Sequence, residues 1–148
     1  MDVSSAPTAL RSLPSWLLGQ GALAAQRLVA DALGPLDAHR SHVSLLSALD
    51  ESGPASQADL GRRCGIDRSD MVALLNVLEA RGDVRRSADP ADSRRNLVTL
   101  TAGGRRRLAA LQRRVAAAQD ELLAALDERE RAELVRLLTL VVDRHDGA

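Results

Sequence analysis

The sequence predicts a mainly helical fold that contains a single β-hairpin. Apolar residues recur at steps of three and four along most of the 148-residue chain, which is the spacing of one helix face. That spacing stops after Gly82, where two short runs with strand character flank a segment of turn-forming residues. Trp16 is the only aromatic residue apart from the histidines, so the core must be built from Leu, Val, Ile and Ala, which suit long helices.

The first third of the chain predicts an arm followed by two helices. Residues 1–14 carry Ser4, Ser5, Pro7 and Pro14 and are expected to form a flexible arm. A helix is expected over residues 16–33 and must end at Gly34-Pro35. A second helix is expected over about residues 37–50.

Two short helices with a tight turn between them come next. Each helix is expected to begin with a capping pattern, in which an oxygen acceptor stands three residues before a second polar side chain. The two pairs are Ser56 with Asp59 and Asp67 with Asp70. The first helix is expected to end at Gly65. Four apolar residues of the second helix lie at i, i+3, i+4 and i+7 and predict its buried face: Met71, Leu74, Leu75 and Leu78.

A hairpin and two further helices complete the pattern. Strands are expected over residues 84–87 and 96–100, with a charged, turn-rich tip between them. Thr101 then begins a long helix with an apolar stripe, and Asp127 with Glu130 begins the last one. The sequence thus predicts about six helices and one hairpin.

These elements predict one domain over residues 15–148. Residues 51–101 are expected to form a lobe, and residues 15–50 and 102–148 a helical region around it. The order helix, tight turn, helix and hairpin is that of a winged helix-turn-helix, in which the second helix can enter a DNA major groove and the hairpin can reach the backbone or the minor groove.

Residues 56–104 resemble the MarR family of transcriptional regulators. The resemblance rests on Ser56-Gln57-Ala58-Asp59-Leu60-Gly61-Arg62-Arg63, Asp67-Arg68-Ser69, Leu78-Glu79-Ala80-Arg81-Gly82, Asp89-Pro90-Ala91-Asp92-Ser93-Arg94 and Leu100-Thr101-Ala102-Gly103-Gly104. It implies a homodimer built from the first and last helices. It also implies a repressor of a pseudo-palindromic double-stranded operator, released by a small-molecule effector or an oxidant.

The helix that would enter the groove has a predictable outer face. With its apolar stripe turned inward, a helical wheel places Ser69, Val72, Ala73 and Asn76 outward. Asn76 could pair bidentately with adenine, and Val72 or Ala73 could meet a thymine methyl group. The other expected DNA-binding residues are Gln57, Arg62, Arg68, Arg85, Arg86, Asp92, Arg94 and Arg95. The resemblance places Arg94 in the minor groove, with Asp92 orienting it.

Overall charge gives no support for nucleic-acid binding. The chain has 20 basic residues, all Arg, and 20 acidic ones. Residues 56–101 hold eight Arg and seven acids, a net charge of +1. Base contacts and DNA shape are therefore expected to contribute more to discrimination than phosphate attraction.

Several alternatives stay open. Cys64 could sense oxidants, but its apolar context favours a small buried residue. His39 and His42 could bind a metal, yet no third ligand is near in sequence, and no metal or cofactor is expected. Trp16, Arg40 and His42 are speculative effector-binding residues.

The chain could also be a winged-helix module that binds protein. No catalytic motif is recognisable, so no enzyme is expected. The absence of a signal pattern and of a long apolar run predicts a cytoplasmic protein without a membrane segment.

Overall fold

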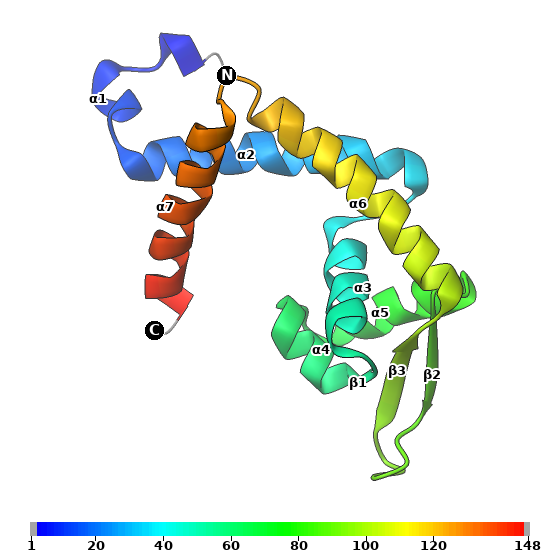
Figure 1. The fold of residues 1–148 in the computed structure, drawn as a ribbon. Coiled ribbons are helices and arrows are strands. Elements are labelled where there is room, and N and C mark those ends of the chain that lie inside the picture. The colour runs from blue at the N-terminus through cyan, green and yellow to red at the C-terminus, as the bar shows by residue number, and fades with distance from the viewer. Residues whose placement is uncertain (1–2, 147–148) are drawn as a thin grey trace. The chain divides into compact units, whose positions relative to one another are not determined.

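The computed structural model describes residues 3–146 and confirms a mainly helical fold with a hairpin. These residues form two compact units, one of residues 29–116 and the other of residues 3–28 together with 117–146. Two long helices, α2 (Pro14–Leu33) and α6 (Ala102–Leu122), contribute to both units (Figure 1). Seven α-helices are described, one more than expected, because Thr8–Arg11 forms a single helical turn, α1.

The unit of residues 29–116 is a winged helix-turn-helix. Between α2 and α6 it contains η2 (Gly34–Leu36), α3 (Arg40–Ser52), β1 (Ala55–Ser56), α4 (Gln57–Cys64), α5 (Arg68–Ala80), β2 (Val84–Ala88) and β3 (Asn96–Leu100). β2 and β3 form the wing that extends from α5 and α6 in Figure 1. The strands and the two short helices thus lie close to their predicted positions.

The wing belongs to a three-stranded antiparallel sheet with strand order β1-β3-β2. Val84 pairs with Leu100 and Ala88 with Asn96, whereas Ala55 of β1 pairs with Val98. The sequence did not predict β1, because two residues are too few to show alternation and their partner strand lies about 40 residues away.

The core of this unit is almost entirely aliphatic. Its fully buried side chains include Leu33, Leu45, Leu46, Leu49, Leu60, Met71, Leu75, Leu78, Val98 and Leu111. They come from α2, α3, α4, α5, β3 and α6, so one cluster fixes both short helices against the sheet. Every residue of the predicted α5 stripe is buried, which confirms that face of the helix.

Both predicted caps of the short helices are present. The amide of Asp59 donates to Ser56 Oγ at 3.2 Å, and the Ser56 hydroxyl donates to Asp59 Oδ2 at 2.8 Å. The amide of Asp70 donates to Asp67 Oδ1 at 2.9 Å. Gly65 ends α4 with a φ of +63°, a left-handed conformation that favours glycine.

The second unit contains η1 (Val3–Ser5), α1, much of α2, the end of α6 and α7 (Glu128–Asp146). Within the segment expected to be an arm, η1 and α1 are short helical turns with no buried residue, and residues 1–2 lie outside the described part. The capping box of α7 is confirmed: the amides of Asp127 and Glu130 each donate to the other's carboxylate at 2.9 Å.

Several large apolar side chains of this second unit are exposed. They include Leu17, Leu18, Leu23, Val135, Leu140, Val141 and Val142. In the single chain, the few helices of this unit leave these side chains in contact with water. Exposure of so much apolar surface to water is energetically unfavourable. Across residues 3–146, no helix combines the length and apolar character needed to cross a bilayer.

Candidate nucleic-acid interface

The face of α5 opposite the core is exposed and nearly free of charge. Ser69, Val72, Ala73 and Asn76 are all exposed, as the helical wheel predicts. Small side chains let a helix approach base edges closely, and an amide can hydrogen-bond them. Contact between these four residues and DNA stays a prediction.

An open hollow of about 800 Å³ lies where α4, α5 and the wing meet. Its lining includes seven of the expected DNA-binding residues: Gln57, Arg62, Arg68, Val72, Arg86, Arg94 and Arg95. They are drawn together from sequence positions up to 38 residues apart. Five of the seven are arginines, so the hollow is suited to anionic groups such as phosphates.

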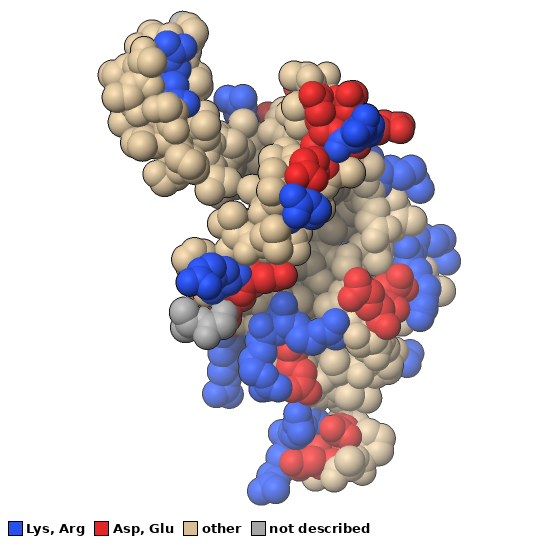
Figure 2. All heavy atoms as spheres, turned by 60° about the vertical axis from the view of Figure 1, so that its left-hand side comes forward, with Lys and Arg blue, Asp and Glu red and all other residues tan. Residues whose placement is uncertain are grey.

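Acidic neighbours restrain several of these arginines. Arg62 donates to Asp59, and Arg95 donates to Ser56 Oγ at 2.9 Å and lies 3.5 Å from Asp59. These contacts, led by the Ser56 hydroxyl, lower the pKa of Asp59. Figure 2 shows blue arginines and red acids side by side toward the end of the wing as well. The arrangement explains how an arginine-rich surface coexists with a local charge near zero.

Other arginines are available for a ligand. Arg68 and Arg85 are exposed, and their guanidinium groups form no hydrogen bond or ion pair with any residue in the described range 3–146. Arg94 has a side chain that is 90% exposed. Its amide and Nε both donate to Asp92 Oδ1, at 3.1 and 3.4 Å. The carboxylate of Asp92 therefore orients the tip of the wing without covering it.

Arg86, an expected phosphate-binding residue, already has partners within the protein, and its contact with DNA stays a prediction. Its Nε and Nη2 donate to Glu79 Oε1 at 3.3 and 2.9 Å, and its amide donates to Glu79 Oε2 at 2.9 Å. Its Nη2 also donates to Asn76 Oδ1 at 2.8 Å. The hydrogen bonds from the side chain and amide of Arg86 lower the pKa of Glu79, whose charge already balances that of Arg86. The pairing of Glu79 with Arg86 was not predicted, because the contact joins the end of a helix to a strand.

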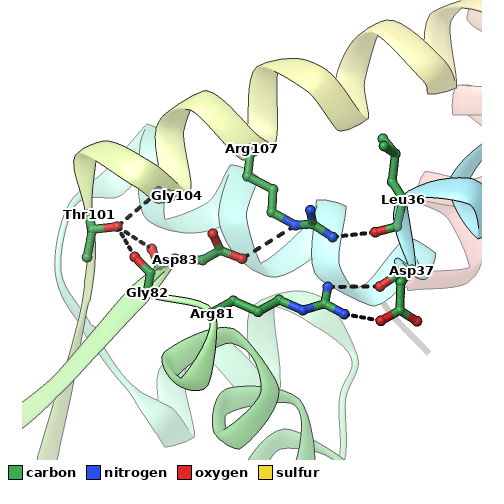
Figure 3. Close-up of polar contacts among 8 residues, drawn as sticks. All are labelled: Leu36, Asp37, Arg81, Gly82, Asp83, Thr101, Gly104 and Arg107. Carbon is green, nitrogen blue, oxygen red and sulfur yellow. Dashed lines mark hydrogen bonds and ion pairs between the residues drawn. The ribbon is translucent and has the colours of Figure 1, made fainter.

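Two further arginines hold the end of α5 and the start of the wing. Arg81 follows α5 and donates to the carbonyl of Asp37 at 2.8 Å and to its carboxylate. Arg107 of α6 donates to the carbonyl of Leu36 at 2.5 Å and lies 3.5 Å from Asp83. Figure 3 shows both guanidinium groups reaching the same turn after α2. This turn is therefore a fixed point for both α5 and α6.

The same region ties the wing to α6 through Thr101. Its hydroxyl lies 2.5 Å from the carbonyl of Gly82 and 3.0 Å from that of Asp83, and the amide of Gly104 donates to it at 2.9 Å (Figure 3). One hydroxyl thus caps α6 and joins it to the turn between α5 and β2. This explains the Leu-Thr-x-x-Gly sequence in physical terms.

Comparison with known proteins agrees with this architecture. The profile of the MarR family matches residues 36–95, from η2 to the wing. A solved structure of a probable transcriptional regulator from Pseudomonas aeruginosa is 31% identical, with a TM-score of 0.77 over 89% of this chain and 98% of the other. The chain belongs to the MarR family.

Two other relatives extend the comparison. The HTH-type transcriptional repressor NicR of Pseudomonas putida is 31% identical to this MarR-family protein over 103 residues, which cover 70% of this chain and 65% of NicR. The structure of BpsR from Bordetella bronchiseptica, whose DNA binding is regulated by 6-hydroxynicotinic acid, has 25% identity and a TM-score of 0.79 over 93% of this chain and 99% of BpsR. The chain spans between 51% and 65% of the length of the curated relatives that it matches.

The three speculative effector residues of this MarR-family protein have different environments. Arg40 is exposed at the start of α3, and Trp16 is half-buried in the unit of residues 3–28 and 117–146. His42 is only 4% exposed, so its ring belongs to the core and lines no open surface. Its Nδ1 has no hydrogen-bond partner within residues 3–146.

The possible sensor residues are also placed. Cys64 is half-buried against the core, and burial raises the pKa of its thiol, an effect that Arg63 partly offsets. The ring of His39 stands edge-on to that of His42 at 5.3 Å between centroids. Within residues 3–146, no group of three or more His, Cys, Asp and Glu side chains could hold a metal ion.

Proposed function

We propose that this protein is a homodimeric transcriptional repressor that binds a pseudo-palindromic DNA operator through α5 and the wing. The observation that carries the proposal is the exposed, uncharged face of α5 beside an arginine-lined hollow and an exposed wing arginine. α5 has the size and side chains that a major groove accepts. Two relatives of this protein support the role: NicR is a repressor, and BpsR is a protein whose DNA binding is regulated.

The wing supplies the expected minor-groove contact. Only the amide and Nε of Arg94 donate to Asp92, and its Nη atoms have no hydrogen-bond partner within the described residues. An arginine presented in this way suits the negative potential of a narrow minor groove. Asp92 already holds part of the Arg94 side chain before DNA binds. The loss of side-chain entropy on binding is therefore smaller.

A second copy of the chain is the partner that the exposed apolar side chains of α2 and α7 fit. Burial of such side chains on dimerisation is favourable by about 25 cal/mol per Å² of apolar surface. A two-fold dimer presents two α5 helices to half-sites one DNA turn apart. The proposal therefore links the apolar helices to operator symmetry.

A small-molecule effector is the proposed signal. BpsR responds to 6-hydroxynicotinic acid, and Arg40 could bind the carboxylate of a ligand of that class. A ligand releases DNA only if it binds the released form of the dimer more tightly than the DNA-bound form. This binding role would place the protein in the cytoplasm with the chromosome, and it requires no catalytic activity.

Fluorescence anisotropy on duplex DNA from upstream of its own gene tests the proposal. A scrambled duplex and a salt series accompany it, and we expect tight, salt-sensitive binding to the native duplex alone. Arg94→Ala should weaken that binding by about tenfold to a hundredfold because a groove contact is lost. The dimer should stay intact, as sedimentation velocity would show.

Arg113→Ala is the matched control for charge. Arg113 is exposed on α6, outside the surface formed by α4, α5 and the wing. Its removal should leave operator affinity within about twofold. Equal affinity of the wild type and Arg94→Ala would show that the wing does not contact DNA, and equal weak binding to all duplexes would favour a protein-binding winged helix.

A further inference from the structure

We propose that Arg86 locks the side-chain amide of Asn76 so that it offers only hydrogen-bond donors to DNA, and that the protein therefore selects guanine at the base pair this residue faces. The inference rests on the proposed function and assigns part of its sequence specificity. It replaces the simpler expectation that an outward asparagine on this helix pairs with adenine. The arrangement that carries it joins three residues from the end of α5 and from β2.

The orientation of the Asn76 amide follows from the chemistry of its neighbour. Arg86 Nη2 lies 2.8 Å from the side-chain oxygen of Asn76. A guanidinium group has donors only, so a stable contact requires the amide oxygen, and not the amide nitrogen, to face it. The NH₂ group must then point away from Arg86. Asn76 is exposed, so this NH₂ group is free to meet a base.

Glu79 keeps Arg86 in place. Two side-chain nitrogens and the amide of Arg86 all donate to the carboxylate of Glu79, at 2.9 to 3.3 Å. Such charge-assisted contacts are stronger than neutral hydrogen bonds. The Arg86 side chain is only 23% exposed, so water competes weakly for it. Arg86 therefore has little freedom to leave Asn76 when DNA arrives.

The locked amide changes which base it can read. A free asparagine accepts from adenine N6 with its oxygen while donating to N7 with its NH₂ group. Arg86 takes one of the two acceptor sites of the Asn76 oxygen and holds that oxygen toward itself. The paired geometry that adenine requires is then lost, and the NH₂ group that remains directed outward faces the adenine amino group donor to donor. Guanine presents two acceptors, N7 and O6, on the same edge, and both match an NH₂ group. We therefore expect guanine to be favoured over adenine.

Selection of randomised duplexes with the full-length protein tests this inference. For the wild type we expect guanine at one position of each half-site, with an affinity about tenfold higher than for adenine. Asn76→Ala identifies the position, because it should abolish the preference there alone. Arg86→Ala frees the amide oxygen, so the preference should change to adenine. Arg86→Met, which keeps the apolar part of the side chain, should give the same change if Arg86→Ala folds poorly.

Arg85→Ala is the matched control. It removes the same charge from the neighbouring residue of β2, which is exposed and contacts neither Asn76 nor Glu79 through a hydrogen bond or ion pair in the described chain. It should lower affinity for all selected duplexes alike and leave the guanine preference unchanged.

Three outcomes would overturn the inference. The first is an adenine preference in the wild type at the position sensitive to Asn76→Ala. The second is a guanine preference that persists in both Arg86 variants, and the third is the absence of any position sensitive to Asn76→Ala. In each case the protein still selects a sequence and the proposed function stands. Selection of no sequence by the wild type would instead remove the proposed function together with the inference.

Discussion

His42 is a buried histidine that the fold keeps uncharged. Burial, the nearby His39 and the guanidinium groups of Arg81 and Arg107 lower its pKa from 6.5 to about 4, and Asp37 opposes the shift. Protonation would place a further positive charge among groups that already hold the turn after α2 (Figure 3). The same turn fixes α5, so the charge of His42 concerns that helix as well as the core.

This lowered pKa predicts a loss of stability in mild acid. Between pH 6.5 and 4 the unfolded chain binds a proton at His42 and the folded chain does not, so the free energy of unfolding falls as pH falls. The full contribution is present above pH 6.5, amounts to about 3 kcal/mol, and is lost as pH falls through about 4. Urea denaturation at a series of pH values measures it.

His42→Leu should remove the His42 contribution to the pH dependence of the free energy of unfolding. His145→Leu is the control, because it changes an exposed site near the end of α7 and should leave that contribution in place. Asp83 acts in the opposite direction, because burial raises the pKa of its carboxyl and so favours the folded state at lower pH. The difference between the wild type and His42→Leu cancels the Asp83 contribution. Identical slopes in these two proteins between pH 4 and 6.5 would show that His42 is not kept neutral.

Some residue environments could be predicted from the sequence and others could not. The exposed face of α5 followed from helical spacing, because Met71 and Leu78 fix which side is buried. The contact of Arg86 with Asn76 did not, because it depends on how a strand leaves a turn and lies beside the preceding helix. The burial of His42 was not predicted, because it depends on how α3 packs against the other helices, and its role in effector binding stays a prediction.

At the level of elements, Gly104 marks a close approach between α6 and the turn before β2. A Cβ atom added there would lie 2.0 Å from the carbonyl oxygen of Asp83 and 2.6 Å from Leu100 Cδ1. The neighbouring Gly103 has room, because the nearest atoms to its added Cβ are 3.5 Å away. Only one of two adjacent glycines is therefore required by packing.

The two glycines give a paired prediction. Gly104→Ala should lower the free energy of unfolding by at least about 2 kcal/mol, because backbone and a buried leucine must move. Gly103→Ala should be neutral or should stabilise by up to about 1 kcal/mol, since alanine favours a helix. Thermal or urea unfolding of both variants measures the difference. Equal stability of Gly104→Ala and Gly103→Ala would refute the close packing of α6 on the turn at Asp83.

Elements with local signals were predicted well, and those that depend on distant partners were not. Ser56, Asp67 and Asp127 cap helices as expected, because a cap needs only residues within one turn. β1 was missed because its strand character comes from pairing with β3. The sequence showed that glycines follow Thr101, but only the approach of Asp83 distinguishes Gly104 from Gly103.

For the whole molecule, the uneven burial of leucine is the main physical constraint. The unit of residues 29–116 buries its leucines, whereas α2 and α7 expose many of theirs in the single chain. Leu140 of α7 is 58% exposed, with Val141 and Val142 beside it. A protein whose net charge is zero has little charge repulsion to keep such surfaces apart, so association through them is favourable.

Leu140→Glu should therefore convert the proposed dimer to a monomer. A carboxylate buried in an apolar interface loses hydration without gaining a partner, which costs several kcal/mol. Sedimentation velocity at micromolar concentration measures the change, and circular dichroism checks that the helices remain. Because a monomer holds only one α5 helix, its operator affinity should fall by at least about a hundredfold, whereas its affinity for an isolated half-site should be unchanged.

Ser93→Glu provides the control for charge, because it adds the same carboxylate at an exposed residue of the wing tip. It should leave the dimer intact while it weakens DNA binding. Leu140→Glu should instead disrupt the dimer, and it should weaken DNA binding only because the dimer is lost. A dimeric Leu140→Glu protein would exclude this face of α7 from the interface, and a wild-type protein that is monomeric yet binds the full operator tightly would separate DNA binding from dimerisation altogether.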